Sequence, residues 1–568
     1  MATFFDLLRL AYIEAPEKPA IKLLYNQQPE DALSYADLLQ GALKYARLLA
    51  DSGVKPGEVA ILIFNHGKDL VFSFFGSVLQ GAIPSIMPFL TEKLSPEQYR
   101  ASLAALFEIT RPAAIITYPE FLHEVLAASK DSSVRVILTS SLVEVGRPAE
   151  IPWESLGGCT RSPQDIVLLQ HSSGTTGLQK GVALSHQAVF NQVQSYAQAI
   201  RLTKEDIIVS WLPLYHDMGL IAGFLLPILY RASLVLMSPF DWVRQPARLM
   251  QAVSKYHGTL TWLPNFAYNF CAQKIRERDL EGVDLSSWRA VINCSEPMHW
   301  KSHQLFLERF QAYGFRPEAL ATCYAMAENV FAVTQGGIDC PVTVDEINGR
   351  IFFERQEAIP AVPGSESLKL LSAGTSIEDT RVKIIDVHGN SLPERHLGEI
   401  ALQSNCMLTG YYHRPNATDK AFLNGWYLTG DLGYMANAEV FVTGRKKDLI
   451  IVGGKNIYPQ DLERLAGDVE GVHPGRIVAF GSYNETAGTE DVIIVAEVEG
   501  REGEVDQEDE SIYRLADAIR RKVTQGSDIA LRNVYLVGKN WLLKTSSGKI
   551  ARAANRDKWL AEQAQRQA

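Results

Sequence analysis

The chain has 568 residues, of which 46% are hydrophobic and 21% are charged, and its formal net charge is -10. A chain of this length exceeds one hydrophobic core, so we expect a large domain and at least one more, packed and ordered. The negative charge argues against a nucleic-acid-binding protein, which normally carries a basic domain.

Neither the cysteines nor the apolar segments indicate export or a membrane span. The six cysteines form no CxxC pair and no metal-ligand spacing, so we expect buried, reduced thiols in a cytoplasmic protein. The first 13 residues lack the basic start and cleavage site of a signal peptide. The most apolar stretch, residues 218–230, is too short to cross a bilayer, and we predict a buried core helix there. Loose membrane contact remains open.

Apolar runs of strand length alternate with helical patterns over the first two-thirds of the chain. The predicted strands are residues 59–64, 113–117, 134–139 and 166–170, and helical stretches include residues 35–52 and 96–109. This alternation is typical of α/β layers with largely parallel strands. After about residue 375, short alternating strands at 382–386, 399–403 and 440–443 indicate a small antiparallel or barrel-like subdomain.

The pattern changes again near residues 445–448. We expect a strand at 448–452, a helix from Pro459, a strand at 492–498 and a helix at 512–524, and we interpret the acidic run 499–510 as a solvated hairpin or loop. The predicted fold class is therefore α/β. A large N-terminal domain (residues 1–446), built of layered sheets and a small barrel-like subdomain, precedes a small mobile α+β C-terminal domain (residues 447–568).

Residues 172–181 read SSGTTGLQKG and follow the strand predicted at 166–170. Two glycines allow a tight turn with inward-facing N–H groups, and the hydroxyls and Lys180 add further donors. Such a concave row of donors suits a polyphosphate. The spacing is not the GxxxxGK[ST] of P-loop NTPases, so a Walker-type ATPase is not supported. Taken alone, the run could equally be a flexible linker.

The order of residues in this run closely resembles the phosphate loop of the adenylate-forming superfamily, which includes acyl-CoA synthetases, luciferases and peptide-synthetase adenylation domains. Further motifs of that superfamily follow in the required order. They are residues 213–219 (PLYHDMG), 293–297 (NCSEP), 324–328 (YAMAE), 427–432 (YLTGDL), 444–448 (GRKKD) and 544–549 (KTSSGK). Each alone has an ordinary structural interpretation, such as a core histidine or a turn aspartate. Six ordered matches indicate the superfamily.

The resemblance implies ATP and Mg²⁺ as cofactors and a set of site residues. The implied nucleotide-binding residues are Ser172, Ser173, Gly174, Thr175, Thr176, Gly177, Lys180, Ser295, Glu296, Pro297, Tyr324, Ala325, Met326, Asp431, Arg445 and Lys447. Among them, Tyr324 is expected to stack on adenine, Asp431 to bind the ribose hydroxyls, and Lys447 to be the hinge between the domains. The implied catalytic residues are Lys549, Thr176, Glu328 and His216, and the implied metal ligands are Glu328 and Thr176.

Four positions depart from the usual motifs. Gln179 stands where proline is usual, Cys294 and Ser295 where Gly-Ala is usual, and Ala325 where glycine is usual. We expect these changes to tune the pocket rather than abolish activity, with Ala325 the least certain because its Cβ could crowd the backbone.

Several segments resemble the fatty acyl-AMP ligase branch in particular. They are residues 209–221, 263–268 and 455–463, and a long segment after Glu328 whose residues 344–363 lie where that branch carries an insertion. A merely longer surface loop is the alternative there, and residues 84–97 resemble the branch less well. The acyl pocket is expected around His216, Met218, Trp262, Phe266 and Tyr268, although such aromatic residues could equally be core.

The resemblance thus implies a ligase that activates a fatty or related carboxylic acid to acyl-AMP and releases pyrophosphate. In this branch the acyl group passes to the phosphopantetheine thiol of an acyl carrier protein, often on a polyketide or peptide synthetase. An acyl-CoA synthetase using the same intermediate is the alternative, to be discriminated by whether residues 344–363 pack against the C-terminal domain. A non-catalytic acyl or nucleotide sensor on the same fold is a third, less favoured hypothesis.

Overall fold

A nine-stranded sheet runs through the large part of the chain, in the order β17-β14-β13-β12-β11-β9-β10-β1-β2. Its strands are β1 (Pro19–Leu24), β2 (Asp31–Ser34), β9 (Ile207–Ser210), β10 (Ser233–Met237), β11 (Leu260–Leu263), β12 (Ala290–Asn293), β13 (Leu320–Ala325), β14 (Ala332–Gly336) and β17 (Thr375–Ser376). The inner strands from β13 to β1 are parallel, whereas β2, β14 and β17 are antiparallel at the edges. Parallel strands end at one edge of a sheet, where ligands bind in open α/β folds.

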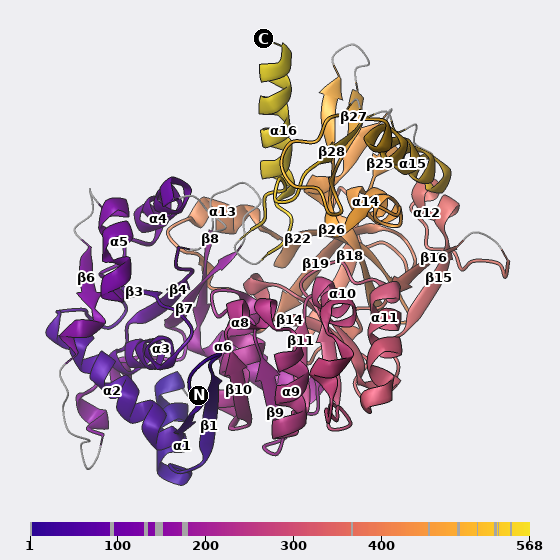
Figure 1. Cartoon of the computed structure of the whole chain (residues 1–568). Coiled ribbons are helices and arrows are strands. Elements are labelled where there is room, and N and C mark those ends of the chain that lie inside the picture. The colour runs from indigo at the N-terminus through magenta and orange to yellow at the C-terminus, as the bar shows by residue number, and fades with distance from the viewer. Residues whose placement is uncertain are drawn as a thin grey trace.

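The computed structural model describes residues 3–90, 96–129, 134–142, 151–172, 180–364, 367–452, 455–484, 489–507, 509–527, 531, 533–545 and 548–567. Helices α8 (Pro239–Arg244), α9 (Ala247–Tyr256), α10 (Asn265–Lys274) and α11 (Trp300–Phe310) lie in front of the central sheet in Figure 1. Strands β11 and β12 are buried along their whole length, as expected for parallel strands covered on both faces.

A second, fully parallel sheet has the order β4-β3-β5-β6. It consists of β3 (Val59–Ile63), β4 (Ile83–Met87), β5 (Ala114–Thr117) and β6 (Arg135–Leu138), with α2 (Tyr35–Asp51), α3 (Lys68–Gln80), α4 (Pro96–Thr110) and α5 (Leu122–Ala128) around it. Helices α2 and α3 approach closely at Gly76, which has no side chain. A Cβ at this position would lie only 2.6 Å from the Ala42 carbonyl oxygen. The predicted α/β layering, including both helices and three strands, is confirmed.

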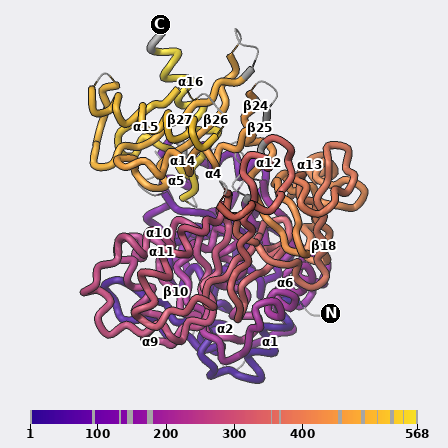
Figure 2. The backbone as a smooth tube through the Cα atoms, turned by 90° about the vertical axis from the view of Figure 1, so that its right-hand side faces the viewer, coloured from indigo at the N-terminus to yellow at the C-terminus, as the bar shows by residue number. Residues whose placement is uncertain are grey.

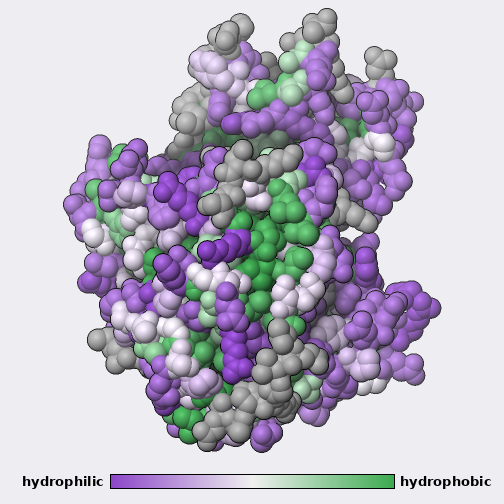
Figure 3. Space-filling model, turned by 90° about the vertical axis from the view of Figure 1, so that its left-hand side faces the viewer, coloured by the Kyte–Doolittle hydropathy of each residue, from purple (hydrophilic) through white to green (hydrophobic). Residues whose placement is uncertain are grey.

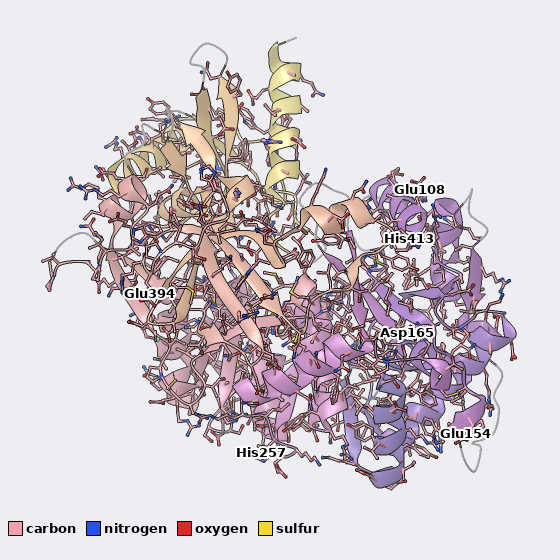
Figure 4. All side chains as sticks on the ribbon, turned by 180° about the vertical axis from the view of Figure 1, so that it is seen from behind. Glu108, Glu154, Asp165, His257, Glu394 and His413 are labelled. Carbon is pink, nitrogen blue, oxygen red and sulfur yellow. The ribbon has the colours of Figure 1, made fainter. Side chains whose placement is uncertain are left out.

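The segments between these sheets and the C-terminal part are antiparallel. β7 (Ile166–Ser172), β8 (Lys180–Ser185) and β20 (Gly410–Tyr411) form one sheet, and β18 (Thr380–Ile385), β19 (Gly398–Ser404), β21 (Phe422–Leu423), β22 (Trp426–Ala436) and β23 (Glu439–Arg445) form another. The expected antiparallel subdomain is thus present. Just after β20, His413 shares a 3.0 Å hydrogen bond with the Ile109 carbonyl and lies beside Glu108 of α4 (Figure 4).

The apolar stretch at 218–230 is buried as predicted, but its first part is a π-helix, Met218–Leu225, followed by α7 (Leu226–Tyr230). Pro227 lacks the N–H that would continue a regular i→i−4 ladder. Gly219 approaches the preceding segment so closely that a Cβ would lie 2.2 Å from the Pro213 carbonyl oxygen. The wider turn directly after His216 and Asp217 was not predicted, and π-turns are frequent at functional sites.

The C-terminal elements form the upper part of the molecule in Figures 1 and 2. They are β24 (Ile450–Val452), β25 (Lys455–Ile457), α14 (Pro459–Gly467), β26 (Val472–Asn484), β27 (Thr489–Val498), α15 (Glu510–Gly526), β28 (Asn533–Val537) and α16 (Arg552–Gln567). Two hydrophobic clusters consist only of residues from this part. The division at residues 446 and 447 stays a prediction.

The segment predicted as an insertion contains β15 (Val344–Asn348) and α12 (Gly349–Arg355), and β15 pairs with β16 (Ser367–Leu371). Phe352 of α12 is buried, with its ring centroid 6.1 Å from that of Tyr434 on β22 and 6.4 Å from that of Tyr458 beside α14. Helix α12 also contacts β25, and the two lie together in Figures 1 and 2. The segment is therefore packed against the C-terminal part and is not a loose surface loop.

Two further expectations concern the surface. All six cysteines are free, but Cys159, in a short 3-10 helix, and Cys340, in a bend, are exposed, so the expectation of buried thiols is wrong for these two. Within the described residues, no helix is both long and apolar enough to cross a membrane. Figure 3 shows hydrophobic side chains gathered in the middle of one face of the large part, bordered by hydrophilic ones.

Candidate active site

Three predicted residues meet where β13 and β23 end beside the middle of β22. The Tyr324 hydroxyl donates a 2.6 Å hydrogen bond to Asp431 Oδ2, and Arg445 Nε lies 3.0 Å from Asp431 Oδ1. The β22–β23 register places Asp431 directly opposite Arg445. The Asp431 charge raises the pKa of Arg445, and burial raises the pKa of the Tyr324 hydroxyl far above its ordinary value. The aspartate is thus held between a cation and a phenol donor.

Glu328 lies in a short turn directly after β13, and a tyrosine fixes it. The Tyr411 hydroxyl donates to Glu328 Oε1 at 2.9 Å and lies 3.0 Å from the Tyr427 hydroxyl. Lys180 Nζ lies 4.4 Å from the centroid of the Tyr411 ring. Sequence reasoning assigned no role to Tyr411 or Tyr427. Tyr427 begins a quoted motif and could have been examined, but no spacing in the sequence relates Tyr411 to Glu328.

The turn after Glu328 carries backbone strain. Val330 is fully buried, with φ of 62° and ψ of −55°. The Phe331 N–H donates to the Asn329 carbonyl oxygen at 2.6 Å, so residues 329–331 form a γ-turn whose central residue has a positive φ. A β-branched residue adopts this conformation only where its surroundings impose it. Here the Leu408 N–H donates to the Glu328 carbonyl oxygen and the Asn329 side chain donates to the Ala332 carbonyl oxygen, so the turn is tied down on both sides.

The segment expected to border adenine follows β12. Ser295 has a φ of 70°, and its hydroxyl lies 3.6 Å from Met218 Sδ at the start of the π-helix. The Glu296 carboxylate accepts a 3.0 Å hydrogen bond from the Phe266 N–H at the N-terminus of α10. This glutamate therefore ties its segment to α10 through the side chain. Pro297 follows it in the same loop, before α11 begins.

The acyl side contains the predicted His216. His216 Nδ1 lies 2.6 Å from Asp217 Oδ1, immediately before the π-helix. Burial alone would raise the pKa of the Asp217 carboxyl. The neighbouring His216, and to a smaller extent Lys549, instead lower this pKa below its ordinary value. Lys549 belongs to the C-terminal part of the chain. Its charge therefore acts on the His216 segment, some 330 residues earlier in the sequence.

Two of the residues expected to line the acyl pocket belong to the core. Trp262 Nε1 donates to the Tyr196 hydroxyl at 2.7 Å, and the Tyr268 hydroxyl donates to the Val291 carbonyl oxygen at 2.9 Å, both within the core cluster. Phe266 instead meets a stacked indole pair. The ring centroids of Trp211 and Trp242 are 3.6 Å apart, with Phe266 edge-on to both. Trp211 lies in a motif run, whereas nothing in the sequence singled out Trp242.

Two predicted lysines, Lys447 and Lys180, influence each other on the nucleotide side. Burial lowers the pKa of Lys447, and the charges of Arg445 and Lys180 lower it further against the opposing effect of Asp448 and Asp431. Residues 173–179, which include Ser173, Gly174, Thr175, Thr176 and Gly177, lie outside the described residues, as does the side chain of Ser172. Ser172 and Lys180 are paired in the β7–β8 register, so the predicted phosphate loop connects two antiparallel strands.

These residues fit a nucleotide with its metal. Arg445 and Lys180 both repel Lys447, and a bound polyanion would relieve this repulsion. No group of three or more metal-ligating side chains occurs in the described part of the chain. A single carboxylate, Glu328, suits Mg²⁺ in the form in which one or two protein carboxylates and phosphate oxygens share the ion. Ala325 and Met326 complete the segment between Tyr324 and Glu328.

Comparisons with known proteins agree with this geometry. A model of the AMP-binding enzyme family matches residues 12–412. The chain belongs to this family. It is therefore an adenylate-forming enzyme by descent, as its motifs implied, and the predicted α/β fold class is that of its structural neighbours.

Relatives of this AMP-binding enzyme include proteins named as a synthetase or a ligase. A putative acyl-CoA synthetase of Caulobacter vibrioides is 30% identical, covering 95% of this chain and 92% of its own length. A medium-chain-fatty-acid–[acyl-carrier-protein] ligase of Moorena producens is 28% identical, covering 98% and 95%. Among solved structures, one from a study of fatty acyl-adenylate ligases from Escherichia coli and Legionella pneumophila has a TM-score of 0.87 and 28% identity, covering 99% and 98%.

Proposed function

We propose that this AMP-binding enzyme converts a fatty acid and ATP into acyl-AMP and pyrophosphate, with Mg²⁺, and passes the acyl group to the phosphopantetheine thiol of an acyl carrier protein. The observation that carries the proposal is the assembly of Tyr324, Asp431 and Arg445 on the nucleotide side. On the acyl side, the charge of Lys549 from the C-terminal part contributes to the lowered pKa of the Asp217 carboxyl beside His216.

The reaction needs charge neutralisation more than proton transfer. A carboxylic acid with a pKa of about 4 is already ionised at neutral pH, so no general base is required. One carboxylate oxygen forms a bond to the α-phosphorus, and the bond from that phosphorus to the leaving pyrophosphate breaks. Both reactants are anions, so catalysis depends on positioning and on fixed positive charge. Magnesium, when bound, would neutralise phosphate charge beside Glu328.

The chain supplies the remaining groups. In this proposal Lys549 meets the carboxylate and the α-phosphate from the C-terminal part, and Lys180 and Lys447 meet phosphate charge; the mutual influence of Lys180 and Lys447 supports their assignment to one site. Asp431, fixed by Tyr324 and Arg445, presents a carboxylate suited to ribose hydroxyls. Thr176 and its neighbours in the phosphate loop would hold the leaving pyrophosphate.

The packing of residues 344–363 favours a carrier protein over coenzyme A as acceptor. Phe352 lies between Tyr434 and Tyr458 and so joins the antiparallel subdomain to the C-terminal part. Such a bridge opposes the large rotation of that part which coenzyme A use requires. The similarity to a ligase named for an acyl carrier protein supports the same acceptor. The alternative is an acyl-CoA synthetase.

Product analysis tests the proposal. The protein is incubated with ATP, Mg²⁺ and a panel of fatty acids, and products are identified by mass spectrometry with either coenzyme A or a phosphopantetheinylated carrier protein present. We expect acyl-AMP that is transferred to the carrier and not to coenzyme A. Efficient acyl-CoA formation would move the protein to the alternative, and no acid-dependent pyrophosphate release across the panel would contradict both in favour of a sensor.

The role of Lys549 is tested by separating the two half-reactions. Lys549→Ala should lower acyl-AMP formation by roughly two orders of magnitude or more, because a charge placed in the transition state is lost. Transfer to the carrier from supplied acyl-AMP should be largely unchanged. Equal losses in both half-reactions would contradict the assignment.

A further inference from the structure

The loop that carries Lys549 is a closed structural unit. Lys544 and Ile550 form a β-bridge at its base, and the Ala551 N–H donates to the Leu543 carbonyl oxygen at 3.0 Å. Inside the loop, the Thr545 N–H donates to the Lys549 carbonyl oxygen at 2.7 Å, and the Lys549 N–H donates to Thr545 Oγ1 at 3.2 Å. The backbone of Lys549 is therefore fixed to the opposite side of the loop.

Asn555 closes the base of this loop from the first turn of α16. Its Oδ1 accepts a 2.7 Å hydrogen bond from the Leu543 N–H, and its Nδ2 donates to the carbonyl oxygens of Leu543 and Ala551, both at 2.9 Å. The side chain is fully buried. Only an amide of this length offers an acceptor and two donors in that arrangement. Asn555 thus determines where the two ends of the loop lie relative to α16.

Arg552, at the start of the same helix, connects the loop to the segment after the proposed hinge. Its guanidinium donates to Asp448 at 2.6 Å, to Glu463 at 2.7 Å and to the Ala479 carbonyl oxygen at 2.8 Å. The Ala479 N–H in turn donates to Glu463 Oε1 at 2.8 Å. Asp448 directly follows Lys447, so one partly buried arginine joins the hinge segment, α14 and β26 to the helix that holds the lysine loop.

The position of Lys549 relative to the hinge is therefore set by two side chains that do not reach the reacting atoms. A displacement of about 1 Å in a catalytic group can cost about 100-fold in rate. The lysine side chain is long and flexible, so its placement depends on the backbone that presents it. That backbone is fixed locally by Asn555 and relative to the hinge by Arg552.

We propose that Arg552 and Asn555 are positioning residues for Lys549, which hold its loop at a fixed place relative to Asp448 so that domain closure delivers the ammonium group to the acyl carboxylate and α-phosphate. This inference rests on the proposed function. It assigns to the start of α16 a role in the adenylation half-reaction that is separate from any general contribution to folding.

The test uses Arg552→Lys and Asn555→Asp in the full chain. Lysine keeps the charge but cannot bind two carboxylates and a carbonyl at once, and aspartate keeps the acceptor but loses both donors. We expect the kcat of acid-dependent pyrophosphate release to fall about 10- to 100-fold, as is typical when the support of a functional group is removed. The KM for ATP should change less than about twofold, and transfer from supplied acyl-AMP less than about threefold. Arg556→Lys is the matched control, because Arg556 lies on the same helix and pairs only with its neighbour Asp557 among the described contacts.

A double-mutant cycle separates positioning from folding. In a Lys549→Ala background, neither substitution should lower the residual adenylation further, because the group that they position is absent. Additive losses, equal losses in both half-reactions, or loss of the folded state in both variants by circular dichroism would overturn the inference. Failure of the wild-type protein to form acyl-AMP would instead contradict the proposed function, so the two failures are distinguishable.

Discussion

Glu328 illustrates how single residues shape the site. Its carboxylate is held by the Tyr411 hydroxyl, while its backbone leads into the strained turn at Val330. Tyr411 is itself supported by Tyr427 and faces Lys180 through its ring. One tyrosine thus links the expected metal ligand to the expected phosphate-binding lysine. Groups that orient a ligand side chain affect metal affinity almost as strongly as the ligands themselves.

Tyr411→Phe should weaken the use of magnesium. Removal of the hydroxyl frees one Glu328 oxygen to rotate, and we expect the Mg²⁺ concentration at half-maximal rate to rise about tenfold. A magnesium titration of pyrophosphate release measures this, and calorimetry of ATP binding with and without Mg²⁺ gives a reading that does not depend on turnover. Tyr412→Phe is the control, because the Tyr412 ring stacks on His413, whereas the hydroxyl that donates to Glu328 is that of Tyr411. An unchanged magnesium dependence would show that the hydroxyl does not orient Glu328.

At the scale of elements, residues 344–363 join two parts of the chain. Ile347 and Phe352 are buried in one cluster with Leu432, Tyr434 and Tyr458. The segment is also tied to the antiparallel subdomain, since Arg395 Nη1 lies 3.0 Å from Asp345 Oδ2 and the Tyr434 hydroxyl donates to Asp345 at 2.8 Å. The apolar packing of Phe352 on Tyr434 and Tyr458 and the partly buried Asp345–Arg395 pair thus tie this segment to the antiparallel subdomain and to the start of the C-terminal part.

Phe352→Ala should loosen this bridge. Truncation of a buried phenylalanine costs about 3–5 kcal/mol of local packing, so the C-terminal part should move more freely. We expect acyl-CoA formation to appear or to increase several-fold, while acyl-AMP formation changes little, and mass spectrometry of both products measures this. Ile359→Ala is the control from the same segment, because Ile359 is 38% exposed. Unchanged acceptor use would contradict the idea that this bridge restricts the motion.

The sequence predicted elements better than contacts, for identifiable reasons. Strands such as β3 and β5 and the amphipathic α2 follow from local apolar periodicity, and the motif residues Tyr324, Asp431 and Arg445 do meet in space. The π-helix after Asp217 depends on a close approach at Gly219, which periodicity does not encode. Tyr411, Trp242 and Asn555 act through contacts with distant segments, and a single sequence contains no signal for such pairs.

At the scale of the whole molecule, buried histidines make stability depend on pH. Burial lowers the pKa of His186 to about 4 and that of His303 to about 3. His186 Nδ1 accepts a 3.1 Å hydrogen bond from the Phe4 N–H, so the neutral ring also ties α1 (Phe4–Glu14) to α6 (His186–Ala199). An unfolded histidine binds its proton near pH 6.5. Between these values the unfolded chain binds more protons, so the free energy of unfolding falls as pH falls.

His186→Asn should reduce this pH dependence. The asparagine Oδ1 keeps an acceptor near the position of Nδ1 but does not titrate. We expect the slope of unfolding free energy between pH 6.5 and pH 5 to decrease by up to about 1.4 kcal/mol per pH unit, the contribution of one proton. Urea unfolding at three pH values measures it. His388→Asn, at an exposed turn, should leave the slope unchanged; an equal effect of both substitutions would contradict the role of burial.

The large and C-terminal parts are also joined by an ion pair. Lys301 on α11 lies 3.0 Å from both carboxylate oxygens of Asp468, which directly follows α14, and Figure 2 shows α14 above α11. In the same arrangement of the two parts, which we call closed, the charge of Lys549 contributes to the lowered pKa of Asp217, and the proposed role of Lys549 in adenylation requires this arrangement. An exposed pair of this kind is worth about 0.2–1 kcal/mol, enough to bias a two-state equilibrium by up to about fivefold.

Lys301→Glu should therefore slow acyl-AMP formation about two- to fivefold, because repulsion from Asp468 disfavours the closed arrangement. Asp468→Lys in the same chain should restore the rate by recreating the pair with reversed charges. The wild-type rate should also fall with added salt, because screening weakens the attraction, whereas the rate of the single variant should rise, because screening weakens the repulsion. Arg201→Glu is the matched control, because Arg201 forms a 3.0 Å pair with Asp339 of nearly the same exposure within the large part. The rate of pyrophosphate release is measured at two ionic strengths for the wild type, the single variant, the double variant and the control. A double variant that stays as slow as the single one would show that the pair does not hold the two parts together, and the closed arrangement would then depend on the apolar contacts of α12 instead.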